Sequence, residues 1–307
     1  MKISGLRKII KEEILAYNFA TFDMLKSIAL NEGGNIPGVN SVVPKEYLSV
    51  TVEHAFRLAG FGKVQYTVVG NKNKPFLGDV DIAVNGKDIA FEINFKGSDS
   101  DQFWFALGEY LSKQKKLKGY KVVKGLKQFH LVIPLVDENK KQISAFTKDG
   151  TPLPELGFVQ LDVFIGDLKW MKNALSASSS DSQYKAVYRN LFLVDILSQL
   201  QFKTSDPAIK RKLQIDWKEG ISVVDFTTDE KGKRKKLKVK KILGDMDKFV
   251  KFLFGPQFKF KDIESFEKLY KLFKSKKFHF PKMRNAIIVA YKKTIKNYKL
   301  DLPKELK

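Results

Sequence analysis

Stretches of alternating or continuous apolar residues predict strands at 64–69, 79–84, 88–95, 129–135 and 158–165. Apolar residues spaced three or four positions apart predict helices at 1–30, 44–59, 101–118 and 183–200. Together these elements predict an α/β (α+β) fold for the first 200 residues.

The rest of the chain has a mainly helical pattern, which is clearest at 262–277 and 282–298. We therefore expect three parts: an N-terminal helical segment at 1–45, an α/β domain at 46–200 and a mainly helical domain at 201–307.

Two aspartates share one face of the strand predicted at 79–84. Asp79 and Asp81 alternate with Val80, Ile82 and Val84, so the apolar side chains face a core and the carboxylates face away from it. The two residues that follow, Asn85 and Gly86, predict a tight hairpin to the strand at 88–95.

In that hairpin Asp79 lies opposite Glu92, and directly opposed like charges destabilise a sheet. A divalent metal ion would compensate them, because Mg²⁺ binds a few carboxylates together with water and phosphate oxygens. The metal ligands would be Asp79 and Asp81, with Glu92 as a further candidate. The alternative is a solvated hairpin edge that carries acidic side chains.

Two further features favour a metal site. Gly70 and Asn71 end a strand shortly before Asp79, and a glycine lets backbone amides approach a triphosphate closely. Asp162 stands in the middle of the apolar strand predicted at 158–165, where a carboxylate is costly unless it is paired or bound to a metal. A set of three such carboxylates is able to hold two metal ions.

The segments 68–71, 78–82 and 159–163 resemble the DNA polymerase beta-like nucleotidyltransferase superfamily. Its pattern is a strand that ends in a glycine turn, then a strand with Asp-x-Asp, then an acidic residue on a later strand. The resemblance covers about residues 45–195 and implies a polymerase-beta-type palm with a mixed sheet. The stretch through Trp170 and Ser176 also resembles uncharacterised nucleotidyltransferases of large phages.

The resemblance implies a function and a set of site residues. Gly70 and Asn71 match the phosphate-binding turn, although Asn71 stands where serine is usual. Asp79 and Asp81 match the paired ligands of two Mg²⁺ (or Mn²⁺) ions, and Asp162 matches the carboxylate that contacts metal and deprotonates the acceptor hydroxyl. The implied reaction transfers a nucleoside monophosphate from an NTP or dNTP to a hydroxyl of DNA or RNA.

Additional nucleotide contacts are expected near the predicted site. Lys72 lies on the glycine turn, and Ser176 and Arg189 follow the strand of the third carboxylate. His130 lies on an apolar strand and is expected to be a buried core histidine.

Charge is distributed unevenly along the chain. Its 56 Lys and Arg against 34 Asp and Glu give a net charge of +22, of which residues 201–307 contribute +17. Such an asymmetry is typical of a nucleic-acid-binding region. The densest run, 231–241, predicts a basic hairpin loop or a mobile arm, and the alternative is a solubilising loop. The candidate nucleic-acid contacts in it are Lys233, Arg234, Lys235, Lys236 and Lys238.

Composition excludes several kinds of site. The chain has no cysteine, which excludes a disulfide-linked partner, a Cys-ligated metal site and a thiol nucleophile. Its three histidines are far apart in sequence, which argues against a multi-His metal site. No apolar run is long enough for a membrane span, and no signal-peptide pattern begins the chain. We expect no membrane association and a cytoplasmic protein, in the host cytoplasm if it is viral.

Two alternatives to a nucleotidyltransferase stay open. One is a metal-dependent nuclease of the PD-(D/E)xK type, built from Asp79 or Asp81 and from Glu92 on the next strand, although Asn94 stands where that pattern has lysine. The other is a catalytically inactive, nucleic-acid-binding protein with a nucleotidyltransferase-like core.

Overall fold

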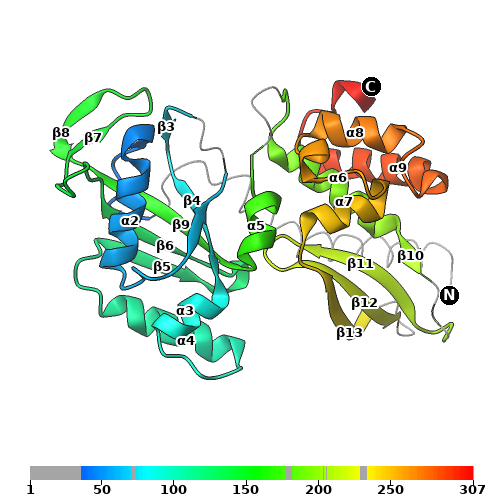
Figure 1. The fold of residues 1–307 in the computed structure, drawn as a ribbon, viewed down its shortest axis with the longest axis horizontal. Coiled ribbons are helices and arrows are strands. Elements are labelled where there is room, and N and C mark those ends of the chain that lie inside the picture. Colours follow the sequence, from blue (N-terminus) through cyan, green and yellow to red (C-terminus); the bar gives the residue numbers. More distant parts are fainter. Residues whose placement is uncertain are drawn as a thin grey trace, which may run out of the picture. The chain divides into compact units, whose positions relative to one another are not determined.

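The computed structural model describes residues 36–70, 74–177, 182–202, 204, 206–228 and 234–306. The chain forms two compact units, which divide after Ala177 (Figure 1). This division comes earlier than the boundary expected at residue 200, because the helix at 186–199 packs against the helices and sheet that follow it. The whole helix predicted at 1–30 lies outside the described residues, and so does the segment 1–45 up to residue 35.

The first unit is built on a five-stranded mixed sheet in the order β2-β4-β9-β6-β5. Its strands are β2 (Tyr66–Val68), β4 (Val80–Asn85), β5 (Gly119–Val123), β6 (Gln128–Pro134) and β9 (Phe158–Gly166). β4 and β9 are parallel neighbours, whereas the other neighbours are antiparallel. The α/β class and the mixed sheet are therefore as predicted, and β5 is a strand that the apolar pattern missed.

Helices and short strands complete this unit. They are β1 (Val43–Pro44), α2 (Leu48–Leu58), β3 (Phe76–Leu77), α3 (Gly86–Glu92), α4 (Ser100–Ser112), β7 (Ser144–Phe146), β8 (Pro152–Leu156) and α5 (Leu168–Ala174). One hydrophobic core joins apolar side chains of α2, α3 and α4 to one face of the sheet. That core takes Val80, Ile82 and Val84 of β4 and Leu161 and Val163 of β9, so the side chains between them point to the opposite face.

The hairpin predicted at Asn85 and Gly86 is wrong. β4 runs directly into helix α3, which ends at Glu92. The two patterns are hard to distinguish in sequence, because Ile89 and Ile93 suit one face of a strand as well as one face of a helix. In the structure Ile89 and Ile93 pack on the core while Phe91 between them is 81% exposed, which only the helix allows.

The second unit contains a four-stranded antiparallel sheet in the order β10-β11-β12-β13, together with helices. The strands are β10 (Gln201–Phe202), β11 (Lys210–Asp216), β12 (Gly220–Thr228) and β13 (Arg234–Leu243), and the helices are α6 (Ala186–Gln199), α7 (Met246–Phe254), α8 (Phe266–Lys274) and α9 (Arg284–Asn297). The helices at 262–277 and 282–298 are thus confirmed as α8 and α9. The mainly helical character is wrong for 201–243, which forms the sheet.

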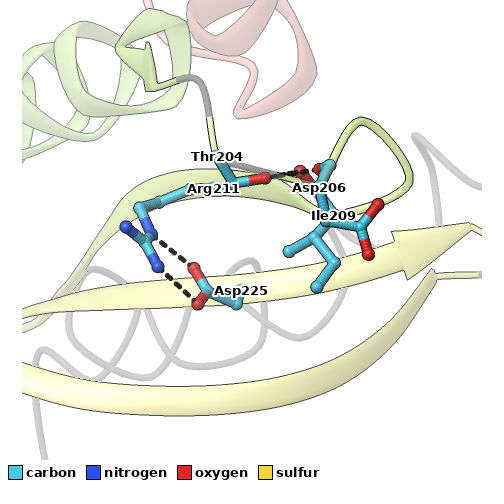
Figure 2. A network of polar contacts seen from close by, with 5 residues as sticks. All are labelled: Thr204, Asp206, Ile209, Arg211 and Asp225. Atoms are coloured by element: carbon cyan, nitrogen blue, oxygen red, sulfur yellow. Dashed lines mark hydrogen bonds and ion pairs between the residues drawn. The ribbon is translucent and has the colours of Figure 1, made fainter.

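Polar contacts join the two central strands of this sheet and close the turn that leads into it. Arg211 of β11 donates two hydrogen bonds to Asp225 of β12, of 2.6 Å from Nε and 2.8 Å from Nη2 (Figure 2). The hydroxyl of Thr204 bonds the carbonyl oxygens of Asp206 and Ile209 and closes the turn before β11. The helices are held by an aromatic cluster in which Phe192 of α6 contacts rings of α8 and α9.

Candidate active site

Two of the three predicted carboxylates lie side by side on the sheet. Asp81 of β4 is the register partner of Asp162 of β9, and the two strands are parallel. Neighbouring strands lie about 4.8 Å apart, and aligned residues point to the same face. Asp79 stands two residues before Asp81, immediately ahead of β4. The three residues therefore meet on the face of the sheet that is turned away from the hydrophobic core.

The glycine turn closes over Asp81. Gly70 has a left-handed backbone (φ 69°), and a Cβ placed on it would lie 2.5 Å from Oδ2 of Asp81. Any larger residue at this position would displace the carboxyl group. Val69, beside it, donates its N–H to the carbonyl of Asp81 at 2.8 Å and ties the turn to β4.

Ser176, which the sequence analysis named as a candidate nucleotide contact, lies against the same turn. It forms a parallel bridge with Gly70, whose N–H bonds the carbonyl of Leu175 at 3.0 Å. Its hydroxyl donates to the carbonyl of Asn173 at 2.7 Å, at the end of α5. Ser176 is therefore held next to Gly70, while Asn71 and Lys72, the other residues predicted for this turn, lie outside the described residues.

The electrostatics of the site are dominated by Asp81. Burial, and to a lesser extent the nearby charges of Asp79 and Asp162, raise the pKa of its carboxyl group to about 8. Desolvation and like charges both disfavour the ionised form. Because Asp79 and Asp162 both act on the pKa of Asp81, the three carboxyl groups are close enough to interact. A cation beside them would offset their mutual repulsion.

His130 joins this site, which the sequence did not predict. It lies on β6 opposite Asp162, and its Nδ1 is 2.5 Å from Oδ1 of Asp162. Its Nε2 is 3.2 Å from Nε2 of Gln128. An ionised carboxylate only accepts hydrogen bonds, so Nδ1 of His130 donates to Asp162 and Nε2 accepts from Gln128.

Gln160 completes the polar row on this face. Its Nε2 donates to Oδ1 of Asp162 at 2.7 Å. Both hydrogen bonds to Asp162 therefore end on Oδ1, and Oδ2 bonds no other residue in the described part of the chain.

The polar row is enclosed by the protein, since its members are all at least nine-tenths buried: Gln128, His130, Gln160 and Asp162. The arrangement fixes the carboxyl plane of Asp162. The sequence feature that could have revealed this polar row is a polar residue at every second position of two apolar strands, Gln128 and His130 on β6 and Gln160 and Asp162 on β9.

A metal site of a particular kind fits these residues. Among the described residues, no three acidic or histidine side chains form a group that could hold a metal ion by themselves. Mg²⁺, however, is usually bound by one or two carboxylates together with water and substrate phosphates. Asp79 and Asp81 match that pattern, and the raised pKa of Asp81 is the sign of a carboxylate that a cation would stabilise.

Glu92 lies away from the paired aspartates, and Arg189 is buried within the second unit. Glu92 ends α3, beyond the far end of β4 from Asp81, and its charge acts on Tyr110 of α4. The nuclease alternative needed Glu92 on a strand paired with β4, and that strand is absent. Arg189 lies in α6 of the second unit, where it is 1% exposed and donates to the carbonyl of Glu264 at 2.9 Å. It is a packing residue of that unit.

The basic run forms strand β13 instead of a loop or arm, at least from residue 234 onward. Lys235, Lys236 and Lys238 are exposed on it, as are Lys240 and Lys241. Arg234 begins the strand, while Lys233 lies outside the described residues. β13 is an edge of its sheet, so its lysines line one border of the second unit.

Comparison with protein-family models found no match to this chain, and comparison with curated protein sequences found none either. In the part of the chain that the structure describes, none of the helices has the length and apolar character needed to cross a bilayer.

Proposed function

We propose that this protein is a metal-dependent nucleotidyltransferase with a polymerase-beta-type palm, which transfers a nucleoside monophosphate from an NTP or dNTP to a hydroxyl of a nucleic acid. The observation that supports it most is the pairing of Asp81 with Asp162 on parallel strands, beside a turn in which only glycine fits. The order of turn, paired aspartates and third aspartate along the chain is the order of that superfamily.

Each residue of the site has a role in this proposal. Asp79 and Asp81 hold the divalent ions, which would neutralise charge on the triphosphate when bound. Gly70 brings backbone close to the phosphates, with Ser176 beside it. Asp162 accepts the proton of the acceptor hydroxyl through Oδ2, because its Oδ1 is already bonded to His130 and Gln160. The hydroxyl oxygen then attacks the α-phosphate, and pyrophosphate leaves.

A nucleic acid is the acceptor that the charge of the chain favours. Residues 201–307 carry a net charge of +17, and the lysines of β13 are exposed. Lysines that neutralise phosphates release counterions, so the affinity for a nucleic acid should fall steeply as salt is added. A small-molecule acceptor has no need for such a region.

The test is an incubation of the full chain with labelled NTPs or dNTPs, Mg²⁺ or Mn²⁺, and single-stranded, primed and tRNA acceptors, resolved by length. Extension of any acceptor supports the proposal. Two variants then separate the chemistries: Asp162→Ala should abolish extension, whereas Glu92→Ala should leave it within about twofold. Shortened products that depend on Glu92 would instead support a nuclease, and retention of acceptors without any new product would support an inactive binding protein.

A further inference from the structure

The second unit contains a pocket between its sheet and helix α7. The cavity has a volume of about 370 Å³, within the roughly 300–1,000 Å³ of small-molecule sites. Its lining is apolar apart from one arginine. The residues are Phe202, Arg211, Leu213, Ile221, Val223, Ile242, Leu243, Phe249 and Phe252. Phe202 and Ile242 are 36% and 41% exposed, so they form its mouth.

Basic side chains stand on the same side of the sheet as this pocket. Lys240 of β13 is the register partner of Val223, which lines the pocket, and Lys238 is the partner of Asp225. Directly paired residues of antiparallel strands point to the same face. Both lysines therefore project from the pocket side of the sheet, and both are exposed.

Arg211 links the pocket to this basic strand. Its Nε and Nη2 are held by Asp225 (Figure 2), which leaves Nη1 without a partner among the residues that the structure describes. The guanidinium is therefore fixed in direction and still has donors to offer. A ligand that enters the pocket would meet apolar and aromatic walls, one oriented donor at the rim and positive charge on the adjacent strand.

We propose that this pocket receives an unpaired base of a single-stranded nucleic acid whose phosphates lie along the lysines of β13. The inference rests on the nucleic-acid acceptor of the proposed function. Aromatic rings that stack on bases, next to a basic track for the backbone, are the usual means of binding single strands. A base in a duplex is already stacked and paired, so only an unpaired base can enter.

The test measures the affinity of the full chain for a labelled oligothymidylate of about twelve nucleotides by fluorescence anisotropy. EDTA is present, so that metal-dependent transfer does not occur. Val223→Phe fills the pocket and should weaken binding at least tenfold, while the slope of log affinity against log salt stays unchanged. Val239→Phe is the matched control. Val239 pairs with Val224, points to the other face and is 57% exposed, so this variant should bind within twofold of the wild type.

A second pocket variant shows whether weaker binding comes from the pocket or from misfolding of Val223→Phe. Phe252→Ala removes a ring from the lining, and with an unchanged melting temperature it should also weaken binding. The double variant Lys238→Ala, Lys240→Ala should instead reduce the salt slope by about 1.4, since each contact to a single strand contributes roughly 0.7.

Three results would overturn the pocket proposal: wild-type affinity in Val223→Phe, equal affinity for an abasic strand of the same length, or displacement of the strand by a fatty acid that competes for the pocket. None of them bears on nucleotidyl transfer, which is measured separately. Conversely, Asp81→Asn should lose transfer and keep single-strand binding. If transfer is never observed but Val223→Phe still weakens binding, the pocket stands and the proposed enzyme does not.

Discussion

The two units differ in the sign of their clustered charges and in how far those charges are exposed to water. The first gathers negative charge on a partly desolvated sheet face, where Asp81 has a pKa raised to about 8. The second spreads positive charge along an exposed edge strand, where water and salt screen it. Exposed like charges cost little free energy, whereas enclosed ones cost much. The proposed metal ions would relieve this cost at the carboxylates, whereas the lysines of β13 are compatible with a polyanion or with solubility alone.

Edge protection is the competing explanation for β13. Lysines on an edge strand prevent it from pairing with a second sheet. Leu237 and Val239 are exposed on this strand between the lysines, which makes such protection useful. Protection requires charge but no particular ligand, so the salt dependence of nucleic-acid binding distinguishes the two roles.

The largest effect is expected for Asp81→Asn. Transfer should fall by about 10³-fold or more, because a metal ligand is lost. The metal-free protein should at the same time melt at a higher temperature at pH 8, since the variant removes a desolvated charge and its repulsion from Asp79 and Asp162. Kinetic assays and thermal unfolding measure both. Asp88→Asn on α3 is the control, and a fall in the melting temperature of Asp81→Asn would argue against repulsion in the site.

Gly70→Ala should affect the same carboxyl group sterically. The added Cβ would lie 2.5 Å from Oδ2 of Asp81, and the φ of 69° is unfavourable for alanine. We expect transfer to fall at least tenfold and the free energy of unfolding to fall by about 1–2 kcal/mol. Gly78→Ala is the matched control, because a Cβ there meets nothing within 4 Å. Equal effects of the two variants, in denaturant melts and in kinetics, would contradict the close approach.

His130 is expected to act by positioning Asp162. His130→Ala should lower kcat by about 10- to 100-fold, as is usual for residues that orient a ligand or base, and should leave the KM for nucleotide nearly unchanged. His130→Gln keeps a donor toward Asp162 and should recover part of kcat. His54→Ala on α2 serves as the control. A rise in KM without loss of kcat would mean that His130 contributes to nucleotide binding instead.

The smallest effect concerns Asp195 in α6, which is buried in the second unit. Its Oδ1 accepts from Thr294 at 3.1 Å, its Oδ2 has no hydrogen-bond partner in the described part of the chain, and burial raises its pKa to about 7. The folded state thus binds a proton that the unfolded state releases near pH 4, and stability is lost as pH rises from about 4 to about 7. Asp195→Asn removes this loss, so it should exceed the wild type by at least about 1 kcal/mol at pH 8.

The control for Asp195→Asn is the same measurement at low pH. At pH 4 both proteins carry an uncharged side chain at this position, and their free energies of unfolding should agree within about 0.5 kcal/mol. A difference that is the same at pH 4 and pH 8 would show that the amide changes packing and that titration of Asp195 contributes nothing.

Sequence predicted the parts of the first unit that depend on strong apolar patterns. β6 and β9 are nearly as predicted, and so is β4 with its aspartates facing away from the core. The hairpin failed because Asn85-Gly86 is only a local signal, and the burial of Ile89 and Ile93 on one core outweighed it. His130 was missed because its pairing with Asp162 is a matter of strand order, which no local pattern reveals.

The sheet of the second unit was missed for a different reason. The lysines of 234–241 lower the apolar content of a strand that has one edge exposed, so its alternation is weak. Arg189 was a candidate nucleotide contact, but its guanidinium donates to the carbonyl of Glu264 within the second unit. The sequence alone does not show that an arginine is used in this way.

The parallel pairing of β4 with β9 also constrains how the protein is made. Parallel neighbours require a long crossover connection, and here everything from α3 to β8 lies between them. Such distant contacts form late, because the entropy of closing the loop is lost before any pairing energy is gained. A nascent chain that ends before residue 158 contains Asp79 and Asp81 but not yet Asp162. The proposed activity should therefore appear in a single step, when β9 joins the sheet and brings Asp162 beside Asp81.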